Sequence, residues 1–211
     1  PDDYREEAIR RNMNPRMLVE FVDGSKTMVE MACIANATGL VPDVPGMHGP
    51  KADRDEMVKV QIPKADGGIL DKKGVVDYTI GKGVAPGVFV IVEAEHPRII
   101  ERMDDLHVGK GPYYAFFRPY HLTSLEVPLT AARIMLYGRP DMVPMPTPVA
   151  EVCAVAKRDL AAGETFDAIG ETCYRSFILT VEDARRQHAV PVGLLEGGKV
   201  TAPVKKGQLL T

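Results

Sequence analysis

Three charged residues in an apolar segment are the strongest candidates for chemistry. Asp23, Lys26 and Glu30 are three and four residues apart within EFVDGSKTMVEMACIAN, so they share one face if the segment is a helix. A lysine beside a carboxylate among apolar groups can donate a proton to a reacting oxygen or accept one from it. The small Gly24-Ser25 pair leaves room for a substrate to approach. An ordinary solvated helix face would show the same spacing, so both interpretations stay open.

A second cluster, Arg118, Tyr120 and His121, follows a strand-like run and precedes a helical one. Arginine suits a bidentate grip on a carboxylate or phosphate, and histidine titrates near neutral pH and can move a proton. The alternative is a cluster at a strand end that pairs with acidic neighbours such as Glu126.

Two weaker candidates contain histidine. Glu93, Glu95 and His96 lie at the end of GVFVIVEAEH, where carboxylates and an imidazole could hold a divalent ion or form an ordinary solvated strand end. His48 lies in a loop rich in Pro and Gly, over 41–50, and is either a lid residue or a plain turn residue.

The elements that must position these residues mix helix and strand. Helical segments are predicted over 4–12, 16–38, 53–60, 96–103, 123–137 and 180–188. The long helix begins after Pro15 and ends at Gly39, and Thr123 or Ser124 caps the helix that Gly138 closes. Strands are predicted over 74–80, 87–94, 113–118, 151–156, 191–195 and 200–204. The almost wholly apolar run over 87–94 is typical of a central buried strand.

A linker divides the chain. The run RPDMVPMPTPV over 139–149 contains four prolines, and we place a domain boundary near residue 147. We therefore predict an α+β fold. Residues 1–147 form a central substrate or catalytic domain with a mixed sheet and packed helices, and residues 148–211 form a small, mainly β domain.

Composition excludes several classes of protein. The chain has 211 residues, a formal net charge of −3 and 45% hydrophobic residues, so we expect a globular protein that binds neither nucleic acid nor a membrane. Three widely spaced cysteines predict reduced, buried thiols in a cytoplasmic protein. No G-x-G-x-x-G follows a strand-like run, and the G-x-x-x-x-G-K letters at 193–199 lack the hydroxyl residue of a phosphate loop. The N-A-T sequon at 36–38 lies in a predicted buried helix, which favours chance.

Three long segments carry a family resemblance. EFVDGSKTMVEMACIANATGLVPDVPGMHGP, DYTIGKGVAPGVFVIVEAEHPR and YYAFFRPYHLTSLEVPLTAARIMLYG resemble the part of homoserine-dehydrogenase-like NAD(P)-dependent oxidoreductases that follows the Rossmann domain. The branch is similar to the reductoisomerase-like protein that replaces deoxyxylulose-phosphate reductoisomerase, with relatives that act on branched sugar acids. The segment after residue 147 resembles the SAF (β-clip) domain of that branch.

The resemblance implies roles for the candidate residues. In homoserine dehydrogenases an Asp and a Lys of the central domain act at the reacting carbon, and Asp23 and Lys26 match that pair, although their tighter spacing argues against homoserine as substrate. We therefore expect Lys26 and Asp23 to be catalytic. The residues expected to bind substrate are Arg118, Tyr120, His121, Ser25, Glu30 and His48.

The resemblance also implies cofactor and partners. NAD(P)H is expected on a Rossmann domain of the same polypeptide that precedes these residues, because the chain starts without Met inside a helix-like pattern. The substrate is a small sugar-like or hydroxy-acid molecule, with or without phosphate, and the protein is expected to be a homo-oligomer. An isomerisation step would call for a divalent ion, for which the sequence offers no clear ligand set. Two rival functions stay open: a non-catalytic module that binds sugar acids, and a module whose main role is assembly.

Overall fold

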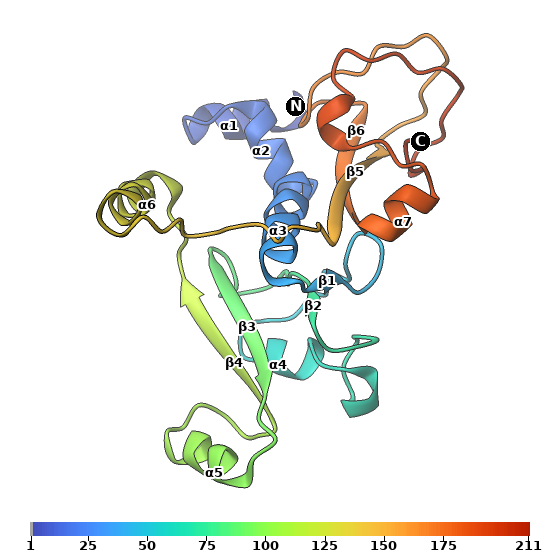
Figure 1. The fold of residues 1–211 in the computed structure, drawn as a ribbon. Helices are drawn as coiled ribbons and strands as arrows, with labels where there is room; N and C mark the ends of the chain where they lie inside the picture. The colour runs from blue at the N-terminus through green and yellow to red at the C-terminus, as the bar shows by residue number, and fades with distance from the viewer. Residues whose placement is uncertain (1) are drawn as a thin grey trace. The chain divides into compact units, whose positions relative to one another are not determined.

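The computed structural model describes residues 2–211, except for the side chain of Thr123. Seven α-helices and three small sheets occur in this part of the chain, which confirms the α+β class (Figure 1). Contacts group the chain into two compact units. Unit 1 contains 1–47, 74–76 and 144–211, and unit 2 contains 48–73 and 77–143. Unit 1 includes residues from both sides of position 147, and the domain boundary there stays a prediction.

Unit 1 is built on an antiparallel hairpin covered by a helix. Strands β5 (Ala150–Ala156) and β6 (Tyr174–Thr180) pair with Cys153 opposite Phe177. Helix α3 (Ser25–Thr38) packs against both strands, and Figure 1 shows it running alongside β5. Asn36 fixes this packing, because its amide donates to the Ala150 carbonyl (3.0 Å) and accepts from the Val149 and Ala150 amides (2.8 and 3.0 Å). The side-chain amide of Asn36, the first residue of the N-A-T sequon, is therefore hydrogen-bonded to the backbone at the start of β5.

Smaller elements complete unit 1. Helices α1 (Arg5–Arg10) and α2 (Pro15–Val22) precede α3, and α7 (Val181–Arg186) follows β6. The two-residue strands β1 (Val41–Pro42) and β2 (Val75–Val76) pair in parallel. The core is formed by small and aliphatic side chains of β5 and the later loops with one aromatic ring: Ala154, Ala156, Leu160, Cys173, Tyr174, Leu195, Val200 and Leu210.

Unit 2 is built on a second antiparallel hairpin. Strands β3 (Gly87–Glu93) and β4 (Tyr113–Pro119) pair with Val90 opposite Phe116. Helix α5 (Pro97–Asp105) lies between them in sequence, α4 (Met57–Val60) precedes them, and α6 (Thr123–Tyr137) follows. Tyr114 is buried, and its hydroxyl donates to the Ile100 carbonyl at 3.4 Å.

Several expected elements were wrong. The helix predicted over 16–38 is broken at Asp23-Gly24 into α2 and α3. The 87–94 strand is not a central buried one, because β3 pairs with β4 in a sheet of two strands and alternates between half-buried and exposed side chains. Within 2–211 the strands form three separate pairs and no mixed sheet. Residues 192–194 form a 3₁₀ turn, and 200–204 contributes a single bridge, Val204 to Leu160.

The thiols are free, as predicted, but Cys33 is exposed whereas Cys153 and Cys173 are buried. Between residues 2 and 211 no helix is both long enough and apolar enough to cross a bilayer.

Candidate functional site

The candidate catalytic residues lie at the corner between α2 and α3. Gly24 has φ 81°, and nothing lies within 4 Å of a Cβ placed on it, so this left-handed conformation rather than lack of space favours glycine there. Asp23 ends α2, and its Oδ1 accepts the Ser25 amide hydrogen at 2.9 Å. The corner therefore places Asp23 outside the helix that carries Lys26.

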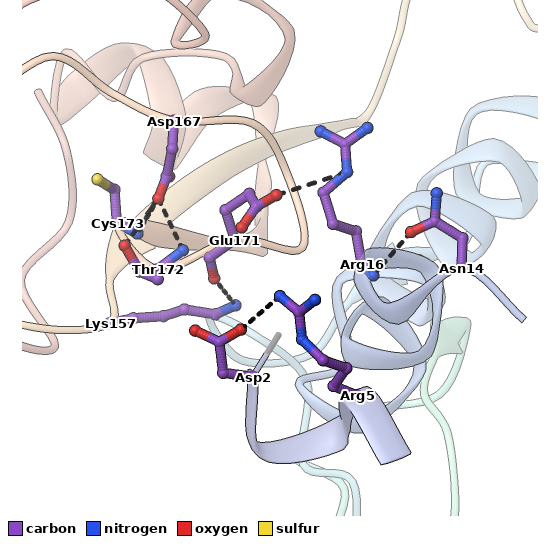
Figure 2. Close-up of polar contacts among 9 residues, drawn as sticks. All are labelled: Asp2, Arg5, Asn14, Arg16, Lys157, Asp167, Glu171, Thr172 and Cys173. Atoms are coloured by element: carbon purple, nitrogen blue, oxygen red, sulfur yellow. Dashed lines mark hydrogen bonds and ion pairs between the residues drawn. The ribbon is translucent and has the colours of Figure 1, made fainter. Parts of the chain in front are cut away.

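Asp23 is paired with a lysine that the sequence did not single out. Lys157 Nζ lies 2.6 Å from Asp23 Oδ2, and the two side chains are only 19% and 12% exposed. Lys157 also donates to the Glu171 carbonyl at 2.7 Å, as Figure 2 shows. The Glu171 carboxylate in turn lies 3.6 Å from the Arg16 guanidinium. Because 134 positions separate Asp23 from Lys157, no local spacing pointed to this pair.

Lys26 has a different neighbourhood. Its ammonium lies 3.4 Å from Glu30 Oε1 and 4.2 Å above the centre of the Phe21 ring, and the side chain is 35% exposed. Phe21 and Val22 also line a shallow cavity between α1 and α2. Lys26 and Glu30 therefore lie side by side, as predicted. The Lys26 ammonium contacts an aromatic ring on one side and remains partly exposed to solvent.

Ser25 is completely buried, and its Oγ accepts the Ser176 amide hydrogen at 3.0 Å. The Ser25 hydroxyl is thus engaged inside the fold, and the expected contact of Ser25 with substrate stays a prediction. The contact attaches the start of α3 to β6 and makes Ser25 a positioning residue for Lys26.

The second cluster lies on unit 2. Arg118 is exposed and forms an ion pair with Glu126. Pairing with an acidic neighbour was the alternative to substrate binding that the sequence left open. Glu126 also accepts the Leu122 amide hydrogen at 2.8 Å, at the start of α6. Tyr120 is exposed with φ 70°, and His121 is half-buried. Arg118 and Tyr120 are accessible, whereas the role of each in binding substrate stays a prediction.

The His48 loop is held by a carboxylate that sequence reasoning missed. The amides of His48 and Gly49 donate to the two carboxylate oxygens of Asp77, at 3.1 and 2.9 Å. A single acidic side chain thereby orders the turn within unit 2. The sequence did not predict this contact, because Asp77 lies 29 positions after His48 and 28 after Gly49.

The Glu93–His96 segment has structural partners. Glu93 forms an ion pair with Lys73, and His96 Nδ1 accepts the Arg98 amide hydrogen at 3.2 Å, which caps α5. Across residues 2–211, no group of three or more His, Cys, Asp or Glu side chains is arranged to hold a metal ion.

Two groups near these elements have altered acidity. Burial raises the pKa of Asp167, but hydrogen bonds from Thr172 and the Cys173 amide outweigh it and lower that pKa overall; Figure 2 shows these contacts. In unit 2 the Tyr113 hydroxyl donates to Asp66 at 2.7 Å, which raises the pKa of Tyr113.

The comparison with protein families finds a match over the front part of the chain. Residues 1–127 match a model of an oxidoreductase catalytic domain. That match covers more than half of the chain, which therefore belongs to the family described as oxidoreductase DRL, catalytic domain. A comparison with curated proteins finds no match. Every predicted site residue lies within 1–127, whereas Lys157 and Glu171 lie beyond it.

Proposed function

We propose that this chain is the substrate-side part of an NAD(P)-dependent oxidoreductase or reductoisomerase. Its substrate would be a small sugar-like or hydroxy-acid molecule, with or without phosphate. The observation that carries the proposal is a half-exposed lysine at the start of α3, held beside a carboxylate and an aromatic ring in a chain of an oxidoreductase family.

Lys26 is the residue that touches the substrate. Its ammonium stabilises the oxygen that gains negative charge when a carbonyl is reduced, or donates a proton to it. Glu30 orients the ammonium through their ion pair, and the Phe21 ring covers one side of it. Asp23 acts as a positioning residue, because its carboxylate is engaged by Lys157 and by the Ser25 amide. Within unit 2, Arg118 could exchange its partner Glu126 for an anionic ligand group.

The nicotinamide cofactor would bind elsewhere. A dinucleotide fold needs several parallel strands with a glycine-rich turn before a helix. The parallel strands found within 2–211 are β1 and β2, which are two residues long, so the described residues do not fit the cofactor. We place it on a Rossmann domain of the same polypeptide, outside these 211 residues. The three free thiols support a cytoplasmic location.

We further propose that residues 148–211 form the SAF-like domain. The β5–β6 hairpin and the isolated bridges Val155 to Leu209, Leu160 to Val204 and Thr165 to Lys199 support a small, mainly β arrangement.

The test measures NADPH and NADH oxidation by the full-length polypeptide with deoxyxylulose phosphate and branched sugar acids. Lys26→Ala should lower kcat/KM by at least about 100-fold, and Lys26→Arg should restore part of it, because removal of one oxyanion-stabilising group costs about that much. Lys110→Ala, which removes an exposed lysine of the same family segment, is the matched control and should leave kcat/KM unchanged. Full turnover by a folded Lys26→Ala protein would refute the role of Lys26.

A further inference from the structure

A cavity in unit 1 has an apolar wall that solvent can reach. The cavity lies between α1 and α2 and has a volume of about 520 Å³. Its apolar wall is formed by Met13, Leu18, Phe21 and Val22, of which Phe21 and Val22 are 48% and 54% exposed. Pockets that bind small molecules have volumes of about 300–1,000 Å³ and are lined mainly by apolar and aromatic groups. The size and the wall of this cavity therefore suit a small ligand with an apolar body.

The polar side of the cavity is formed by Tyr4, Glu7 and Arg11. Glu7 pairs with both Arg10 and Arg11, so that one carboxylate serves two guanidinium groups. These three charged groups have one positive charge in excess, and the Arg11 side chain is 59% exposed. A guanidinium group can bind a carboxylate through two parallel hydrogen bonds. The polar side therefore favours a ligand that carries one negative charge.

The cavity adjoins the lysine at the start of α3. The Phe21 ring belongs to the apolar wall, and the Lys26 ammonium lies 4.2 Å above the centre of the same ring. A ligand that packs against Phe21 therefore lies on the ring that also supports Lys26.

We propose that this cavity is a binding site for a small monocarboxylic acid with an apolar body, and that the bound ligand packs against the ring beneath Lys26. Arg11 releases Glu7 and binds the ligand carboxylate. Glu7 keeps Arg10 as its partner, so this exchange leaves no carboxylate unpaired. The Tyr4 hydroxyl supplies a further hydrogen-bond donor at the polar side. The site is independent of the chemistry assigned to Lys26.

The charges of the polar side favour a carboxylate over a phosphate. A phosphate monoester carries about 1.5 to 2 negative charges at pH 7, which exceeds the single positive charge in excess among Glu7, Arg10 and Arg11. A carboxylate matches that charge and leaves the apolar body of the ligand to cover Phe21 and Val22.

The first experiment titrates the methyl-labelled chain with 3-phenylpropanoate and follows it by NMR. The methyl resonances of Met13, Leu18 and Val22 should shift with a Kd of about 1 mM, whereas those of Ile178 in the core should not move. The Lys26 Cε resonance should shift with the same Kd, because the ligand packs against the Phe21 ring. Propanoate lacks the apolar body and 3-phenylpropan-1-ol lacks the carboxylate, so each should bind at least about 10-fold more weakly.

Two substitutions at the polar side separate recognition of the carboxylate from an effect on helix stability. Arg11→Gln should weaken binding of 3-phenylpropanoate about 10-fold and leave binding of the alcohol unchanged. Glu7→Gln should strengthen binding of the acid about threefold, because Arg11 then has no partner to release. Arg5→Gln, which removes an exposed arginine of the same helix, is the matched control and should leave the Kd unchanged.

A substitution at the apolar wall tests the other half of the site. Phe21→Ala should weaken binding of both the acid and the alcohol at least about 10-fold, because both present the same phenyl group to the wall. Val29→Ala is the matched control: Val29 is 39% exposed on α3 and is not part of the wall, so this variant should bind as the native chain does. Circular dichroism verifies that every variant is folded.

Methyl resonances that stay in place up to about 20 mM 3-phenylpropanoate would overturn the proposal. So would equal weakening of the acid and the alcohol by Arg11→Gln, or weaker binding of the acid by Glu7→Gln, since a purely structural ion pair would make both substitutions act in the same direction. Tighter binding of 2-phenylethyl phosphate than of 3-phenylpropanoate would assign the polar side to phosphate and would overturn the choice of a carboxylate. Shifts at the cavity with an unchanged Lys26 resonance would overturn the link to Lys26.

Discussion

The ion pair between Asp23 and Lys157 allows a quantitative prediction about the corner between α2 and α3. The Asp23→Asn substitution keeps the Oδ1 acceptor for the Ser25 amide but removes the charge 2.6 Å from Lys157. An exposed ion pair contributes at most about 1 kcal/mol, and breaking a fully buried pair costs about 3–5 kcal/mol. With both side chains 12–19% exposed, the pair lies between these limits, and we expect a loss of about 2 kcal/mol in the free energy of unfolding.

The Asp23→Ala substitution removes the acceptor as well. The Ser25 amide then loses its partner, which adds about 1 kcal/mol and gives a total of about 3 kcal/mol. Because the chain has no Trp, urea unfolding should be followed by far-ultraviolet circular dichroism. A double-mutant cycle with Lys157→Met isolates the pair and should give a coupling free energy of about 1.5 kcal/mol.

The exposed pair Arg102–Asp105 is the matched control. Its atoms lie 3.3 Å apart with both side chains more than half exposed, so Asp105→Asn should change the free energy of unfolding by less than about 0.5 kcal/mol. A coupling free energy below about 0.5 kcal/mol for Asp23 and Lys157 would refute the inference that this pair holds the corner.

Three further predictions follow from single contacts. Asn36→Ala should lower the free energy of unfolding, measured in urea, by about 3 kcal/mol. It removes the hydrogen-bond partner of the Val149 amide and of both the amide and the carbonyl of Ala150. With a thiol reagent, exposed Cys33 should react fast and Cys153 slowly, since burial raises the pKa of Cys153 to about 11; equal rates would contradict this. The lowered pKa of Asp167 stabilises the fold above pH 3.8, and this contribution should fade as pH falls below that value, so Asp167→Asn should flatten the acid limb of stability against pH.

Local patterns predicted much of the secondary structure. An almost wholly apolar run marked β3, and Pro97 and Gly138 marked the start of α5 and the end of α6. These signals succeed because the cause lies within a few residues of the effect. The burial of β3 was predicted wrongly, since composition tells how apolar a strand is but not whether another strand or chain covers it.

The geometry of the corner between α2 and α3 was predicted only in part, because it depends on long-range contacts. Spacing placed Asp23 and Lys26 on one helix, but Gly24 in a left-handed conformation ends that helix between them. Glycine is the residue that takes this conformation at least cost, yet it is also tolerated inside helices, so the sequence alone does not decide between the two. The contact of Lys157 with Asp23 comes from a distant part of the chain and left no local pattern.

Residues 1–127, which match the family model, depend on contacts with a later part of the chain. The family match ends at residue 127, but the charge that engages Asp23 comes from just after β5, and the amide that engages Ser25 comes from β6. The orientation of the Lys26 helix therefore depends on residues outside that match. A chain that stops at residue 127 should lose both contacts, leave Asp23 without its partner and release the start of α3. The later segment is thus part of the structure that positions Lys26, whatever else it binds.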